Sequence, residues 1–212
     1  QGYGWYNADY NYTGWTLPNG TNTRSDQAWS FYYSAVIKNA NLLLDNTANQ
    51  TPSASLDALR GEALGLRAWA YLNLINNFQQ TYKGNENAKG VPLHITISPE
   101  DQGRGTVQQA YDQIIADLTQ AETLLTGKPR ASKERIDVSV VRGFRARAAL
   151  VMENWAAAAT YAKSARTGYT LMSNTVYQSR SGFSSISNPE WMWGALIPAD
   201  KATIPIGYVH AD

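Results

Sequence analysis

The sequence predicts a mainly α-helical protein, built from helical hairpins that are joined by long irregular loops. Apolar residues recur at three- and four-residue steps over most of the middle of the chain, which is the period of an α-helix. A capping-box sequence opens one of these periodic segments, and a Gly and a Pro close it. The stretches between them are rich in Gly, Asn and Pro, which predicts loops.

The first helix is predicted to begin near Ser25 or Asp26, since either side chain can cap a helix N-terminus. Its apolar stripe runs from Trp29 to Leu43 at helical spacing. Residues 46–55 are polar and contain a proline, so we expect a loop there.

The next helix has the strongest pattern, with one apolar face made by Leu59, Ala63, Leu66, Ala70 and Leu74. Small residues are frequent in this helix. Gly61 and Gly65 lower helix stability, so their expected use is the close approach of a neighbouring helix. Residues 83–103 then predict a long loop that contains an extended run from Val91 to Ile95.

Three further helices follow. The first opens with the capping-box pair Thr106 and Gln109 and stops at Gly127 and Pro129. The second carries apolar residues up to Val151, and after a break the third runs from Trp155 to near Gly168. Short breaks and Ala-rich contact positions predict stacked hairpins of tetratricopeptide type. The uneven spacing makes them degenerate repeats.

The chain is therefore expected to divide into three parts. Residues 1–24 form an aromatic-rich irregular N-terminal segment, and residues 25–168 form the helical, tetratricopeptide-like domain. Residues 169–212 form a loop-rich segment with prolines at 189, 198 and 205.

Composition excludes several function classes. The net charge is +1, from 18 basic and 17 acidic residues, so a nucleic-acid partner is not expected. The chain has 0 Cys, which excludes disulfides, thiolate metal sites and thiol catalysis. No apolar run approaches the roughly 18 residues that would span a bilayer. No cofactor is expected.

The aromatic content points to a binding surface. The chain holds 7 Trp and 13 Tyr but only 4 Phe, and Trp and Tyr suit half-wet surfaces because they carry a polar group. Aromatic rings alternate with Asn and Asp in the N-terminal segment, where irregular backbone favours binding residues. The candidate ligand-binding residues are Trp5, Tyr6, Tyr10, Tyr12 and Trp15, with Arg24 as a hydroxyl partner. The alternative is that these rings pack the segment onto the helices.

The remaining tryptophans are assigned to structure. Trp29, Trp69 and Trp155 lie on helical faces and are predicted to be core residues. Trp191 and Trp193 alternate around Met192, which predicts a short strand.

No catalytic constellation is evident, so the chain is not expected to be an enzyme. His94 and His210 lack metal-ligand spacing. Glu86, Glu100 and Asp101 supply enough carboxylates for a glycosidase pair, but a solvated loop is the favoured interpretation. Phosphate-binding loops, nucleophile elbows and His-Glu-x-x-His are absent from the sequence.

Several segments, in order, resemble the SusD/RagB family of outer-membrane nutrient-binding proteins. Residues 29–41 (WSFYYSAVIKNAN) are similar to an early helix of the family, and residues 61–74 (GEALGLRAWAYLNL) resemble its Glu-Ala-x-x-Leu-Arg-Ala-x-x-Tyr helix. Further similarity lies in Gly90–Leu93, in Arg104–Leu118, in Arg147–Leu171 and in Asn188–Glu190. Gly65 and residues 76–80 depart from the family pattern.

The resemblance implies a lipoprotein on the outer face of a Bacteroidota outer membrane. It would capture oligosaccharides without chemistry and deliver them to a SusC-like TonB-dependent transporter. The membrane would be reached through an N-terminal lipid anchor that is absent from this chain. Family members are usually longer, so residues 169–212 are expected to start a C-terminal part that is missing here. The alternative function is a helical repeat scaffold that binds a protein or peptide.

Overall fold

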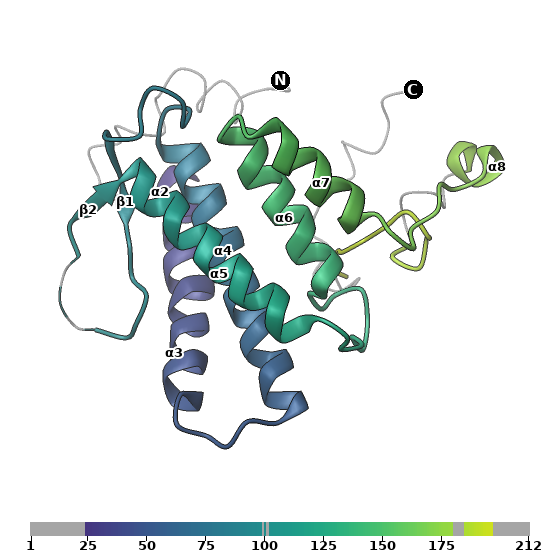
Figure 1. Ribbon diagram of the computed structural model, residues 1–212, viewed down its shortest axis with the longest axis horizontal. Coiled ribbons are helices and arrows are strands. Elements are labelled where there is room, and N and C mark those ends of the chain that lie inside the picture. Colours follow the sequence, from purple (N-terminus) through teal and green to yellow (C-terminus); the bar gives the residue numbers. More distant parts are fainter. Residues whose placement is uncertain (1–23, 99, 101, 180–184, 197–212) are drawn as a thin grey trace, which may run out of the picture.

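The computed structural model describes residues 24–98, 100, 102–179 and 185–196, and this part of the chain is mainly helical (Figure 1). The helices are α2 (Arg24–Ser30), the π-helix η1 (Phe31–Ile37), α3 (Lys38–Thr47), α4 (Ala54–Phe78), α5 (Val107–Leu125), α6 (Val138–Val151), α7 (Trp155–Ala165) and α8 (Asn174–Gln178). Strands β1 (Lys89–Pro92) and β2 (Arg104–Thr106) pair antiparallel. The predicted fold class is confirmed.

The long helices pack in chain order. Helix α3 contacts α4, α4 contacts α5, α5 contacts α6, and α6 contacts α7. In Figure 1, α6 and α7 form a pair beside α5, while the β1–β2 hairpin lies at the opposite side of the helical stack. Such nearest-neighbour packing is typical of helical repeats, as the stacked-hairpin interpretation requires.

The helix starts are set by local side chains. The Ser53 hydroxyl accepts a hydrogen bond from the Leu56 amide at 3.2 Å and opens α4. The predicted capping box is confirmed, since Thr106 Oγ1 accepts from the Gln109 amide and Gln109 Oε1 accepts from the Thr106 amide. Gly127 has a φ of 73°, the left-handed conformation that commonly follows a helix end.

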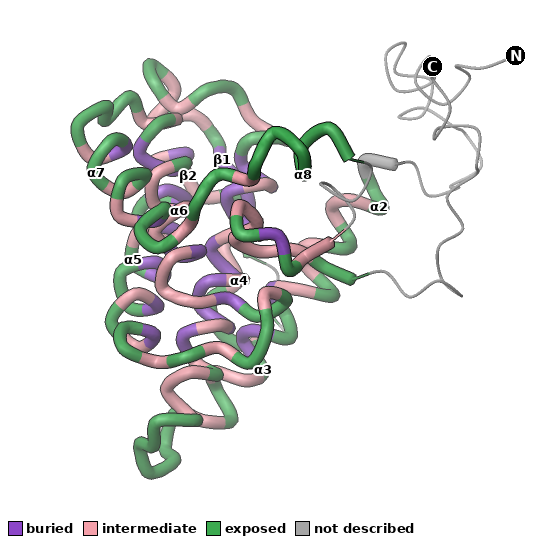
Figure 2. Tube along the Cα trace, turned by 90° about the vertical axis from the view of Figure 1, so that its right-hand side faces the viewer, coloured by how far each residue is buried: buried purple, intermediate pink, exposed green. Residues whose placement is uncertain are grey.

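Helix α4 is the centre of the core. Its buried residues run along most of its length, and the buried stretches of the chain lie between neighbouring helices (Figure 2). Gly61 lies against α5, where an added Cβ would be 2.7 Å from Leu125 Cγ. The expected close approach of a neighbouring helix is confirmed at this glycine.

A buried ion pair joins α4 to α5. Arg67 and Asp117 are 5% and 2% exposed, and their charges meet through two hydrogen bonds of 2.8 and 2.7 Å. Arg67 Nη1 also donates to Asn41 Oδ1 and to the Ile95 carbonyl oxygen. One guanidinium therefore connects three helices with the loop that follows β1.

The structure corrects two predictions about tryptophans. Trp155 is 61% exposed at the start of α7, so its assignment to the core was wrong. It occupies the first position of α7, whose buried residues are Ala158 and Ala165. Trp29 and Trp69 are half-buried and pack against the core. The strand predicted around Met192 is absent, since residues 191–196 are irregular.

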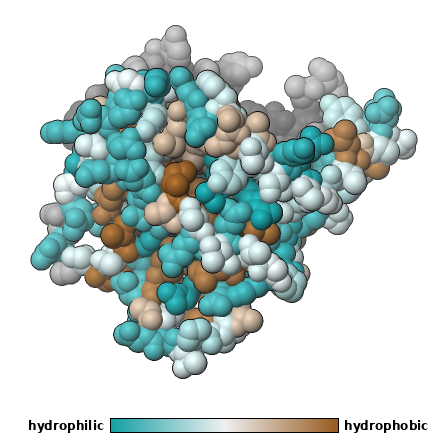
Figure 3. Space-filling model, in the orientation of Figure 1, coloured by the Kyte–Doolittle hydropathy of each residue, from teal (hydrophilic) through white to brown (hydrophobic). Residues whose placement is uncertain are grey.

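The segment after α7 extends away from the helical stack. Figure 2 shows α8 exposed along its length, and Figure 3 shows hydrophobic side chains gathered on this arm. Leu171 is 84% exposed and Tyr177 is 61% exposed. The predicted division of the chain at residues 24 and 168 stays a prediction. Among the described helices, none combines the length and the apolar character needed to cross a membrane.

Candidate functional site

The N-terminal residues predicted to bind ligand cannot be placed. Trp5, Tyr6, Tyr10, Tyr12 and Trp15 lie outside the described residues. Arg24 is the first residue of α2, but its side chain also lies outside the description. The N-terminal site therefore stays a prediction.

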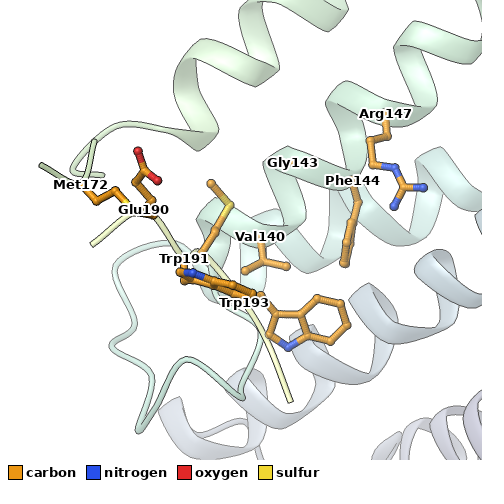
Figure 4. Close-up of a pocket in the computed structure, with 9 residues that line it drawn as sticks. Val140, Gly143, Phe144, Arg147, Met172, Glu190, Trp191 and Trp193 are labelled. Atoms are coloured by element: carbon orange, nitrogen blue, oxygen red, sulfur yellow. The ribbon is translucent and has the colours of Figure 1, made fainter. Parts of the chain in front are cut away.

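A different surface carries a pocket that combines aromatic rings with polar side chains, as expected of a ligand-binding site. It lies between α6 and the segment that ends the described chain, and its volume is about 450 Å³ (Figure 4). This volume is within the range of roughly 300 to 1,000 Å³ that is usual for small-molecule sites. Its lining residues are Val140, Gly143, Phe144, Arg147, Met172, Glu190, Trp191, Met192 and Trp193.

Helix α6 supplies one wall of the pocket. Gly143 and Phe144 lie three and four residues after Val140, and Arg147 lies four and three residues after them, so the four residues share one face of the helix. Val140 and Phe144 are buried, whereas Arg147 is exposed. At Gly143 an added Cβ would lie 3.7 Å from Met192 Sδ, an ordinary van der Waals distance, so Met192 packs close to the helix backbone here.

The opposite wall is irregular backbone that two residues before α6 hold in place. Lys133 Nζ donates to the Asn188 carbonyl oxygen at 2.5 Å, and the Gly194 amide donates to the Lys133 carbonyl oxygen at 3.2 Å. The Leu196 amide donates to Glu134 Oε1 at 3.2 Å. These contacts hold the segment as irregular backbone, whereas the alternation of Trp191 and Trp193 had predicted a strand.

The two tryptophans of this wall have different surroundings. Trp193 Nε1 donates to the Glu134 carbonyl oxygen at 3.0 Å, and its ring meets Phe144 edge-on at 5.7 Å. Trp193 is thus fixed by its neighbours. The half-buried Trp191 has no ring stacking and no side-chain hydrogen bond with the described residues. Its indole is the part of the pocket best able to accept a ligand surface.

Two opposite charges flank the aromatic residues. Figure 4 shows Glu190 toward one end of the pocket and Arg147 toward the other, with the tryptophans between them. Within the described part of the chain, neither side chain has a hydrogen bond or ion pair. The pocket therefore offers an apolar face together with planar donors and acceptors, which suits a ring that bears hydroxyl groups.

Sequence reasoning missed most of this pocket. Trp191 and Trp193 were singled out but assigned to structure, and Arg147 and Glu190 were not considered as site residues. The pocket forms where two segments about 45 residues apart in the sequence come into contact, and the local periodicity of a sequence does not predict such contacts. The Asn-Pro-Glu-Trp sequence at 188–191 was the one local sign of an irregular, aromatic segment.

The described residues give no support for metal chemistry. Among them, no group of three or more His, Asp or Glu side chains could hold a metal ion. His94 lies in the loop after β1 and packs edge-on against Tyr33. Glu100 is exposed, and Asp101 and His210 lie outside the described residues.

Comparison with known proteins decides the family. The sequence model of the SusD-like family, described as "Starch-binding associating with outer membrane", matches residues 3–150. The chain belongs to the SusD-like family. No curated protein matches the chain.

Solved structures of SusD-like proteins have the same fold. A SusD-like carbohydrate-binding protein from Bacteroides vulgatus is 28% identical with a TM-score of 0.78, and the match covers 90% of this chain and 41% of that one. A second protein from the same species, described as "Putative sugar binding protein", is 26% identical with a TM-score of 0.69, and the match covers 78% of this chain and 40% of that one.

A more distant SusD-like protein, described as laminarin-binding, is 21% identical with a TM-score of 0.58, covering 73% of this chain and 35% of that one. At this identity the likeness concerns the fold alone. In each comparison the SusD-like chain described here spans about two-fifths of its relative or less.

Proposed function

We propose that this SusD-like chain captures oligosaccharides without chemistry and passes them to a TonB-dependent transporter in the outer membrane of a bacterium. Family membership and the carbohydrate-binding relatives support the ligand class. The family description supports the location at the outer membrane. A SusC-like transporter and an N-terminal lipid anchor are the further parts of this proposal.

One observation of the structure carries the proposal. The half-buried Trp191 lies between the Glu190 and Arg147 side chains, and within the part of the chain that the structure describes it has no ring contact and they have no ion pair. A sugar ring has an apolar face of C–H groups and an edge of hydroxyls, so it matches an indole face flanked by planar polar groups. A peptide-binding scaffold does not require this combination.

The experiment compares two candidate sites on one protein. A glycan array first identifies an oligosaccharide that binds the chain, and calorimetry then measures its affinity. If the α6 pocket is the site, Trp191→Ala weakens binding by about tenfold or more, because a central aromatic contact is lost. Arg147→Ala weakens it through the loss of hydroxyl hydrogen bonds.

Matched controls separate the α6 pocket from the predicted N-terminal site. Trp155→Ala removes an exposed tryptophan outside the pocket and leaves affinity unchanged. Trp5→Ala and Trp15→Ala weaken binding only if the N-terminal segment contributes. If Trp191→Ala and Arg147→Ala leave the affinity unchanged while Trp15→Ala lowers it, the site is the predicted N-terminal one instead. That site consists of Trp5, Tyr6, Tyr10, Tyr12, Trp15 and Arg24. Absence of binding to any glycan would overturn the proposed function.

A further inference from the structure

A second cavity lies on a different part of the helical stack, between η1 and the loop after β1. Its volume is about 390 Å³. The residues that line it are Trp29, Tyr33, Ser34, Ile37, Lys38, Asn41, His94, Thr96, Ile97 and Ser98. None of them lines the α6 pocket. The two cavities are therefore separate sites on the chain.

Buried polar groups hold one wall of this cavity in a fixed irregular conformation. Asn41 is 1% exposed, and its Nδ2 donates to the His94 carbonyl oxygen at 2.8 Å. Tyr71 holds the same residue, since its hydroxyl accepts from the His94 amide at 2.6 Å. The Ile97 amide donates to Asp45 Oδ2 at 2.8 Å. A wall fixed before ligand arrives loses little conformational entropy on binding.

The π-helix η1 supplies the facing wall. Its hydrogen bonds span five residues, as in the bond from the Lys38 amide to the Tyr33 carbonyl oxygen. Seven consecutive residues in this form are unusual, and π-helical turns occur frequently at functional sites. Tyr33, Ser34 and Ile37 of this segment line the cavity. The π-helix η1 and the irregular residues 94–98 thus meet at one cavity.

The polar and aromatic groups of this cavity suit a sugar ring. Tyr33 meets His94 edge-on, with ring centroids 5.6 Å apart, and meets Trp29 with centroids 4.9 Å apart. Burial raises the pKa of the Tyr33 phenol above its ordinary value, so the hydroxyl stays a neutral donor and bonds the Pro92 carbonyl oxygen. Hydroxyl groups come from Ser34, Thr96 and Ser98.

The charge of the cavity differs from that of the α6 pocket. Lys38 is exposed and has no ion pair with the described residues, and no carboxylate is among the lining side chains. Asp45 of α3 accepts a hydrogen bond from the Ile97 amide. The exposed Glu100 lies two residues beyond Ser98 and does not line the cavity. Arg104 does not line the cavity, and its guanidinium donates to the Gly90 and Lys89 carbonyl oxygens. Lys38 is thus the positive charge among the lining side chains. An anionic group is therefore favoured here, and hydrogen bonds between charged partners are the stronger ones.

We propose that this cavity between η1 and residues 94–98 binds the carboxylate-bearing ring of an acidic oligosaccharide, with Lys38 as the partner of the carboxylate. This inference rests on the proposed function only in taking a glycan as the ligand, and it names the class of that glycan. A uronic acid unit combines the ring, the hydroxyls and the negative charge that the lining residues match.

The test uses two probes of equal length, the trisaccharides trigalacturonate and maltotriose. Calorimetry on the full chain measures both. Trigalacturonate binds more tightly than maltotriose, and its affinity falls as NaCl is added, because an ion pair is screened by salt. Lys38→Gln weakens trigalacturonate binding by about tenfold or more and Lys38→Arg largely restores it. Lys163→Gln, at an exposed lysine on α7, has no effect.

Several outcomes would overturn the inference. Equal affinity for the two trisaccharides, absence of trigalacturonate binding, or an unchanged affinity in Lys38→Gln would each do so. If one of these outcomes is found and a neutral glycan still binds with an affinity that Trp191→Ala weakens, the acidic cavity fails while the proposed function stands. Conversely, loss of trigalacturonate binding in Lys38→Gln but not in Trp191→Ala would support the acidic cavity as a site separate from the α6 pocket.

Discussion

The indole ring of Trp193 meets that of Trp69 edge-on, with ring centroids 5.8 Å apart and an interplanar angle of 84°. Trp69 in turn meets Tyr32 of η1 at 5.5 Å, and Trp193 meets Phe144 of α6 at 5.7 Å. A continuous row of rings thus links η1, α4, the irregular segment after α8 and α6. This row anchors one wall of the α6 pocket to the helical core.

Removal of Trp193 should destabilise the chain more than removal of Trp155. Trp193→Ala deletes two ring contacts and a hydrogen bond, so we expect a loss of about 2 kcal/mol in the free energy of unfolding. Trp155→Ala deletes a ring that is 61% exposed and should change stability by less than about 0.5 kcal/mol. Urea unfolding measures both. Equal losses would contradict the anchoring role of Trp193.

The buried pair Arg67–Asp117 should be essential to stability. Arg67→Met leaves the Asp117 carboxylate buried without its partner, which is expected to lower the free energy of unfolding by about 3–5 kcal/mol. Arg135→Met breaks an ion pair with Glu62 in which the arginine side chain is 47% exposed, and the expected loss is about 0–1 kcal/mol. Urea unfolding of both variants tests this order, and a reversed order would refute it.

Substitution by alanine should have opposite effects on stability at two glycines of α4. At Gly61 a new Cβ would be 2.7 Å from the buried Leu125 Cγ, so overpacking is expected to lower stability by about 1–2 kcal/mol. At Gly65 the nearest atoms would be 3.4 Å away, and the helix preference of alanine should give a gain of up to about 1 kcal/mol. Thermal melting of the two variants distinguishes them. A stabilised Gly61→Ala would show that α5 moves freely away from α4.

Glu122 should make the free energy of unfolding depend on pH in the acid range. Burial alone would raise the pKa of its carboxyl, but hydrogen bonds from Arg142 and Arg145 outweigh burial and hold the pKa below its ordinary value of 4.5. Because the folded-state pKa is the lower one, this stabilisation is complete above the unfolded pKa. It is lost as the pH falls through the folded pKa.

The Glu122→Gln variant tests this pH dependence. The wild type should exceed it in the free energy of unfolding by roughly 1 kcal/mol at neutral pH. The difference should shrink as the pH falls below 4.5, the ordinary value of the group. Glu100→Gln, at an exposed glutamate, serves as the control and should show no such trend. A difference that stays constant down to acid pH would reject the role of the two arginines.

The helices were predictable because their signals are local. The Thr106–Gln109 capping box, the stop at Gly127 and the break between Val151 and Trp155 are all where the sequence placed them. Each depends on side chains within four residues of the backbone groups that they satisfy. The π-helical form of η1 had no such signal, since its apolar pattern is also that of an α-helix.

The candidate sites were predictable only in residue type. The excess of Trp and Tyr indicated an aromatic binding surface, but the residues chosen for it lie in the N-terminal segment, outside the described residues. Trp191 meets Arg147 in one pocket because Lys133 and Glu134 hold the irregular segment against α6. The exposure of Trp155 likewise follows from how α7 packs on α6 and not from its own helical position.

The sequence by itself determined the helical fold class, most of the long helices and the resemblance to the SusD-like family, because each is written in short-range patterns of apolar, capping and motif residues. The short helix α8 lies in the segment that was expected to be loop-rich. Only the tertiary structure decided which aromatic rings are free, which charges are paired and which loops are held rigid. These properties depend on contacts between distant segments, such as those of Arg67 with Asp117 and Ile95, and such contacts exist only once the helices have packed.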